Sequence, residues 1–117
     1  MARHRIDQKP LSANDAFKGR RFKTDLYKKY EYTMMYLLPK GIEIPDGKLT
    51  LCLTFGLSNS GSDLDNPVKQ FQDCLSKKYK FNDNLIYRLE VDKVIVPKGK
   101  EFIEFEIKPY NPWKNIQ

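Results

Sequence analysis

The architecture of this 117-residue chain follows most directly from residues 48–75, KLTLCLTFGLSNSGSDLDNPVKQFQDCL. Leucine or phenylalanine occupies every second position of residues 49–57, with smaller residues between them. Such alternation predicts a half-buried strand. The polar residues 58–62 break that strand, and apolar residues return at helical spacing from Pro67 to about Tyr79. This part of the chain therefore predicts a strand followed by an amphipathic helix.

The residues before this stretch predict a short strand, a loop and a first helix. Residues 4–10 favour a strand that ends at Pro10, and the basic residues 11–23 favour a loop with a turn at Gly19. Thr24 is a suitable helix cap, and Pro39 with Gly41 ends the helix. The apolar stripe that we expect to pack on the sheet is formed by Leu26, Tyr30, Met34 and Leu37.

The residues after the second helix predict two more strands. Residues 85–96 form one strand, 97–100 a hairpin turn, and 101–107 its partner, while the tail 108–117 is irregular. The order β-α-β-α-β-β predicts an α/β (α+β) protein, with one small mixed sheet and two helices packed against it. A chain of this length and pattern predicts a single domain over 1–117.

The composition predicts a soluble protein. Of all residues 40% are hydrophobic, but no apolar run approaches the ~18 residues of a membrane span, and residues 1–15 lack the apolar core of a signal peptide. We therefore expect a cytoplasmic protein that does not contact a membrane. Cys52 and Cys74 are expected to be buried, reduced thiols, and their spacing does not favour zinc.

Charge indicates a polyanionic partner. The net charge is +6, and basic residues alternate with aromatic ones in FKGRRFKTDLYKK, residues 17–29. Lysine and arginine that neutralise phosphates release counterions, so such a segment is typical of nucleic-acid contact. An ordinary solvated face remains the alternative. The basic residues of this segment are Lys18, Arg20, Arg21, Lys23, Lys28 and Lys29.

Two aspartates directly before the second helix contrast with the basic chain around them. Asn66 and Pro67 suit the cap and first position of a helix, so Asp63 and Asp65 lie near its positive end. In an extended segment both carboxylates project to one side, which suits a hard divalent cation such as Mg²⁺. The alternative is that the two acids only favour the helix dipole.

A third acid and a lysine complete the candidate site. Asp83 lies between the second helix and the strand after it, and Asp73, inside the helix, is its rival. Lys69 projects from the first turn of the helix, where an ammonium group would stabilise the charge that develops on a phosphate.

These residues resemble the signature of the RusA family of Holliday-junction resolvases, small endodeoxyribonucleases of bacteria and their phages. The resemblance covers residues 8–107 and rests on Asp63-Leu64-Asp65-Asn66, Lys69, Asp73-Cys74-Leu75, Asp83 and the segment Pro10-Leu11-Ser12-Ala13-Asn14. Two departures are that Asp83 is a single acid flanked by asparagines, where the family often has two adjacent acids, and that the loop before it is one residue shorter.

The resemblance implies an enzyme that nicks four-way DNA junctions in recombination and repair. Asp63, Asp65 and Asp83 would be catalytic acids that bind Mg²⁺, with Mn²⁺ as a substitute. Lys69 would be a catalytic residue next to them. Ser12 and Asn14 would approach the DNA beside Asn66 and Lys69. The charge pattern separately predicts that the basic loop, residues 18–23, holds the DNA backbone with Lys28 and Lys29.

Because a junction needs two opposed nicks, a homodimer is expected. The long strand 85–96, the first helix and the tail with Trp113 are all candidates for its interface. Two alternatives remain open, namely a nuclease of flaps and other branched DNA, and a DNA-binding module without catalysis.

Overall fold

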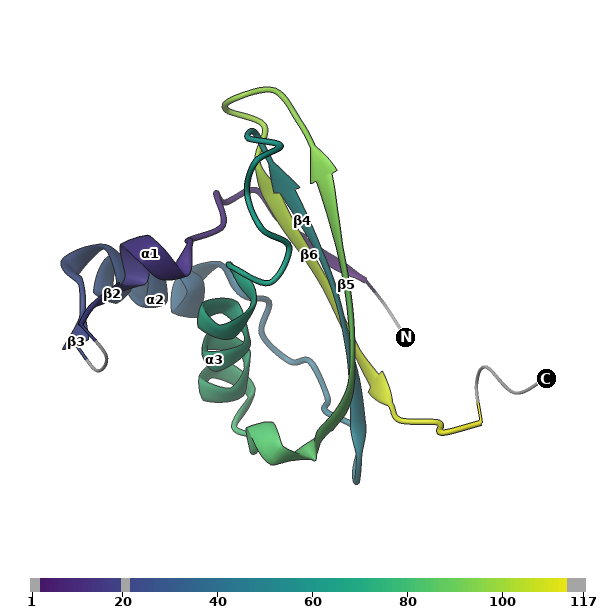
Figure 1. Cartoon of the computed structure of the whole chain (residues 1–117). Coiled ribbons are helices and arrows are strands. Elements are labelled where there is room, and N and C mark those ends of the chain that lie inside the picture. The colour runs from purple at the N-terminus through teal and green to yellow at the C-terminus, as the bar shows by residue number, and fades with distance from the viewer. Residues whose placement is uncertain (1–2, 20–21, 114–117) are drawn as a thin grey trace.

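The fold contains a four-stranded sheet, and the helices lie on one face of this sheet (Figure 1). The computed structural model describes residues 3–19 and 22–113. The strand order is β1-β6-β4-β5, so the α+β class with a small mixed sheet is confirmed. The elements are β1 (His4–Ile6), α1 (Ala13–Ala16), β2 (Phe17–Lys18), β3 (Phe22–Lys23), α2 (Asp25–Leu37), β4 (Leu49–Leu57), α3 (Val68–Tyr79), the 3₁₀ helix η1 (Asp83–Leu85), β5 (Ile86–Ile95) and β6 (Phe102–Pro109).

Strand β4 is one of the two inner strands of the four-stranded sheet and is buried on both faces. The prediction of a half-buried strand is wrong, because every residue of Leu49–Leu57 is buried. One face packs under the helices. The other carries Thr50, Cys52 and Thr54 beside longer charged residues of the neighbouring strands, for example Glu90 and Glu106 on either side of Cys52. The long stems of such side chains cover the small residues between them.

Strands β5 and β6 are not partners, so the predicted hairpin at 97–100 is wrong. β5 pairs with β4 in parallel and β6 pairs with β4 antiparallel, one on each side. Residues 97–100 do turn, and the Lys100 amide donates to the Pro97 carbonyl at 2.9 Å. Strands that follow one another in a sequence often pair with each other. Here β4, α3 and β5 form a βαβ unit, so β5 occupies one edge of β4 and β6 pairs with its other edge.

The N-terminal elements are shorter and more numerous than predicted. The predicted strand 4–10 is reduced to His4–Ile6, and its ladder with β6 ends with Ile6 opposite Ile103. The predicted loop 11–23 contains the one-turn helix α1, capped by the Ser12 side chain, and the small hairpin β2–β3. Gly19 has φ +72° in that hairpin, which fits the predicted turn.

Helix α2 begins as predicted and buries part of the predicted stripe. The Thr24 hydroxyl accepts from the Tyr27 amide at 3.2 Å, which confirms the cap. The buried residues are Tyr27, Tyr30 and Met34, while Leu26 and Leu37 are exposed. Tyr30 and Met34 of the predicted stripe are therefore buried as expected, whereas Leu26 and Leu37 are not, and Tyr27 packs inward instead.

The core lies between α3 and the sheet. Phe71 of α3 contacts Phe55 of β4 and Phe105 of β6 edge-on, with ring centroids 6.3 and 5.7 Å apart. Cys52 and Cys74 are both buried thiols, as predicted. The predicted irregular tail begins later than expected, because β6 includes Lys108 and Pro109. No helix among residues 3–19 and 22–113 has the length and apolar character of a membrane span.

Candidate functional site

Two segments far apart in the sequence meet at the start of α3. The Ala13 amide donates to Asn66 Oδ1 at 3.0 Å, and Gln70 Nε2 donates to the Leu11 carbonyl at 2.8 Å. Gln70 is fully buried, and it also bonds the Asn66 carbonyl at 2.9 Å. Thus the segment 10–14 is fixed against the turn that carries Asp63 and Asp65.

Asn66 makes this tertiary bond in place of the predicted cap. Helix α3 begins at Val68, Pro67 precedes it, and no side chain caps its first turn. The prediction that Asn66 caps the helix is therefore wrong. The Asn66 amide oxygen serves the backbone of α1, which local sequence alone does not reveal.

Asp63 and Asp65 lie in a turn with exposed side chains. The Asn66 amide donates to the Asp63 carbonyl at 3.3 Å, and the Val68 amide donates to the Asp65 carbonyl at 3.1 Å. Residues 64–67 form turns, so the prediction of an extended segment here is wrong. Within the part of the chain that the structure describes, neither carboxylate accepts a hydrogen bond or joins an ion pair. Both remain open to solvent.

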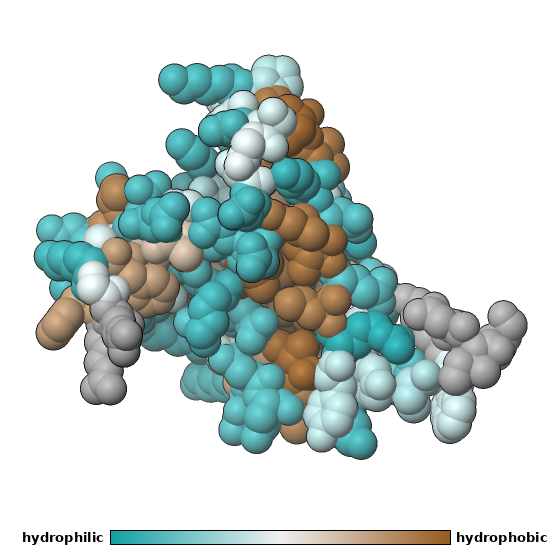
Figure 2. Space-filling view, in the orientation of Figure 1, coloured by the Kyte–Doolittle hydropathy of each residue, from teal (hydrophilic) through white to brown (hydrophobic). Residues whose placement is uncertain are grey.

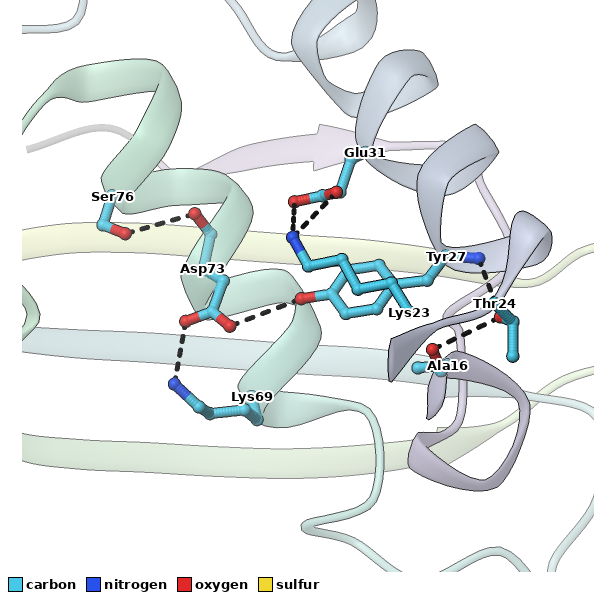
Figure 3. Close-up of polar contacts among 8 residues, drawn as sticks. All are labelled: Ala16, Lys23, Thr24, Tyr27, Glu31, Lys69, Asp73 and Ser76. Carbon is cyan, nitrogen blue, oxygen red and sulfur yellow. Dashed lines mark hydrogen bonds and ion pairs between the residues drawn. The ribbon is translucent and has the colours of Figure 1, made fainter. Parts of the chain in front are cut away.

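Asp73, by contrast, uses both of its carboxylate oxygens. Lys69 Nζ lies 3.0 Å from Oδ1, one turn away on the same helix, and the Tyr27 hydroxyl donates to Oδ2 at 3.3 Å (Figure 3). The hydrogen bond to Asp73 raises the pKa of Lys69 above its ordinary value, and the charges of Asp73 and Asp83 add to it against the opposing effect of partial burial. The Lys69 amine is therefore a fixed cation whose side chain is 66% exposed.

Tyr27 extends this network from α3 to α2. Burial raises the pKa of its hydroxyl well above the usual range, and the charge of Asp73 contributes. Lys23 Nζ lies 4.8 Å from the centre of the Tyr27 ring and pairs with Glu31 at 2.9 Å (Figure 3). Sequence reasoning missed Tyr27 and Glu31. The spacing of Lys69 and Asp73, four residues apart, was the local signal for their pair.

Asp83 lies at the other end of α3, at the junction with β5 where it was predicted. One of its oxygens, Oδ1, is buried without a hydrogen-bond partner among the described residues. A helix of 12 residues spans about 18 Å, which separates the Asp63–Asp65 turn from Asp83 along the axis. Across residues 3–19 and 22–113, no three His, Cys, Asp or Glu side chains are placed to hold a metal ion. The three predicted ligands therefore do not fit Mg²⁺ as they stand.

A surface pocket of about 260 Å³ lies where the two segments meet. Ser12 and Asn66 line it together, and Ser12 also caps α1 by accepting from the Asp15 amide at 3.2 Å. Asn14 is exposed on α1 beside it. The remaining lining is mostly polar, with Lys9, Pro10, Asp15, Leu57, Ser58, Asn59, Ser62, Pro67 and Glu101.

The basic loop is divided between free and internally paired cations. Lys18 is exposed, whereas Lys23 is held by Glu31, so its charge is largely balanced within the protein. The predicted contacts of Arg20 and Arg21 lie outside the described residues. Lys28 and Lys29 are exposed on α2.

Comparison of the chain with protein-family models and with curated proteins gave no match.

Proposed function

We propose that this protein is a DNA endonuclease that acts on branched DNA, with the four-way junction as its substrate. The observation that carries the proposal is the hydrogen bond between Ala13 and Asn66. It joins the two separate pieces of sequence that resemble the resolvase signature, Pro10–Asn14 and Asp63–Asn66, into one site. The net charge of +6 provides the long-range attraction that a polyphosphate partner requires.

In this proposal Lys69 contacts the phosphate of the DNA strand. Its amine is exposed, and Asp73 holds it in one position. The amine is therefore preorganised, and little conformational entropy is lost when it binds an anion. Ser12 and Asn66, which line the pocket, approach the DNA backbone together with the exposed Asn14, and Lys18 with Lys28 binds flanking phosphates.

The open acids at the turn are the proposed catalytic groups. Asp63 and Asp65 are exposed and unpaired in the described part of the chain, which keeps them available. The resemblance implies that they bind Mg²⁺ or Mn²⁺ with Asp83. Among the described residues the three carboxylates are not gathered, so metal dependence is an expectation from that resemblance alone.

A DNA-binding module without catalysis is the second candidate. The specific observation that favours it is the separation of Asp83 from the Asp63–Asp65 turn by the length of α3. In that case the two acids would only interact with the helix dipole. A nuclease that prefers flaps over four-way junctions is a variant of the first candidate.

Paired nicks require two copies, and we propose that β5 provides their contact. It is an edge strand of 10 residues, and Leu89, Val94 and Ile95 expose 44%, 44% and 50% of their surface. An apolar strip runs beside α3 over this side of the sheet (Figure 2). Sedimentation should report a dimer, and Leu89→Lys should shift it to a monomer; a wild-type monomer at all concentrations would contradict this surface.

The activity is tested with synthetic DNA and a matched pair of variants. Wild type with Mg²⁺ should nick a four-way junction in opposed strands, with less cleavage of flap and linear duplex DNA. Asp65→Asn should bind the junction and leave it intact. Asp46→Asn is the control, because Asp46 is an equally exposed aspartate before β4, at the far end of that strand. If wild type binds but never cuts, the second candidate is correct.

A further inference from the structure

The outward face of α2 carries two tyrosines with no structural role in the described part of the chain. Tyr32 and Tyr36 expose 81% and 84% of their surface, more than the other large apolar side chains that are exposed. The helix already buries Tyr27 and Tyr30 on its opposite face, so packing is complete without the outer pair. Single exposed apolar residues need no explanation, but two rings aligned one turn apart form a surface.

Positive charge surrounds these rings. Lys28 lies one turn before Tyr32 on the same face, and Lys29 lies beside it, and both are exposed. Of the acids of this helix, Glu31 is turned toward Lys23, with only 12% of its side chain exposed. Asp25 is exposed in the first turn, about two turns before Tyr32. The face therefore favours an anion that also has flat apolar groups.

We propose that this face, formed by Lys28, Lys29, Tyr32 and Tyr36, binds unpaired bases of DNA by stacking. The proposal rests on the DNA-binding function proposed above and specifies where the protein recognises a branch. Bases stack on exposed aromatic rings regardless of sequence, while lysines contact the adjoining phosphates. A nucleic acid combines both features, and a protein interface does not, because lysine is depleted at the centre of such interfaces.

The spacing of the two rings favours an unstacked strand. Four helical residues rise about 6 Å, whereas stacked bases in a duplex are about 3.4 Å apart along each strand. Two neighbouring bases of an intact duplex therefore cannot match the two rings. Bases that are separated at a branch point can, and the surface would select branched over linear DNA.

The test compares three paired variants by fluorescence anisotropy on two DNAs, a four-way junction with unpaired nucleotides at its centre and a linear duplex of equal length. Tyr32→Ala with Tyr36→Ala should weaken junction binding by roughly tenfold or more and duplex binding by less than about twofold. Tyr32→Phe with Tyr36→Phe keeps both rings and should bind as wild type. Lys28→Gln with Lys29→Gln should weaken binding of both DNAs and reduce the slope of the salt dependence by about one for each phosphate that the variant no longer neutralises.

Each other outcome overturns the inference in a recognisable way. Unchanged junction binding by the alanine pair excludes stacking, and equal weakening on both DNAs excludes selection of a branch, while in each case wild-type binding still supports the proposed function. If the alanine pair converts a dimer to a monomer in sedimentation, the face is a protein interface. If wild type binds neither DNA, the proposed function fails as well.

Discussion

Three aspartates in or before α3 fall into two groups: the bonded group is Asp73 alone, and the open group is Asp63 and Asp65. Asp73 is partly buried, and both of its oxygens are bonded, to Lys69 at 3.0 Å and to Tyr27 at 3.3 Å. Asp63 and Asp65 project into solvent from a turn, and no partner for them exists among the described residues. A bonded acid contributes to the fold, whereas an unpaired, exposed acid is available to a ligand. Substitutions should therefore separate stability from activity between the two groups.

The largest effect is expected on activity at the open group. Asp65→Asn should reduce junction cleavage by roughly 100-fold or more, since the charge that it removes has no substitute in the turn. Junction affinity and the midpoint of urea unfolding should be those of wild type. Cleavage at the rate of the Asp46→Asn control would contradict a catalytic role for Asp65.

The next effect is expected on stability at the bonded group. Asp73→Ala removes the acceptor of the buried Tyr27 hydroxyl, and the free energy of unfolding should fall by about 1–3 kcal/mol. Lys69→Ala is the matched comparison, because its amine is mostly exposed and an exposed ion pair contributes less than about 1 kcal/mol. Urea unfolding measures both. Equal decreases in the two variants would contradict the dominant role of the tyrosine bond.

Alkaline pH should act on the core beside the bonded group. Burial raises the pKa of the Cys74 thiol from 9.0 to about 12, so the folded state retains a proton that the unfolded chain releases. The stabilising contribution is present below pH 9 and is lost as pH rises toward 12. Between these values the free energy of unfolding should decrease by up to about 1.4 kcal/mol per pH unit from this group. Cys74→Ala should decrease less steeply in urea titrations, and a parallel pH profile would refute this contribution.

The smallest effect is expected on stability at the open group. Asp63→Asn should change the free energy of unfolding by less than about 0.5 kcal/mol, because the carboxylate is exposed and unbonded in the described chain. Thermal unfolding at two salt concentrations measures this change. A decrease as large as that of Asp73→Ala would mean that the turn is a structural element like the bonded group.

The local signals in the sequence were sufficient for most elements of the fold. Alternation identified β4, helical spacing identified α3, and Thr24 marked the start of α2. They were insufficient for pairing, because which strands adjoin β4 depends on the path of the chain through α3. The burial of both faces of β4 follows from that pairing, and alternation cannot report it.

The sequence pattern selects the candidate residues but does not give their arrangement in space. The acids, Lys69 and the Ser12 segment were identified by their pattern, and the structure joins the turn and that segment through Asn66. The bond of Asp73 to Tyr27 crosses between two helices, and Asp83 and Asp63 are kept apart because the 12 residues of α3 lie between them. Neither is encoded in a local spacing.

The proposed function requires DNA to contact the protein where residues 10–14 meet the turn at 63–66. Hydrogen exchange of wild type, measured by mass spectrometry with and without a four-way junction, detects this contact. The junction should slow exchange in peptides covering residues 10–18 and 60–70 and leave the turn before β4, residues 45–48, unchanged. Protection confined to that distant turn, or the same exchange everywhere at saturating DNA, would contradict the proposed function.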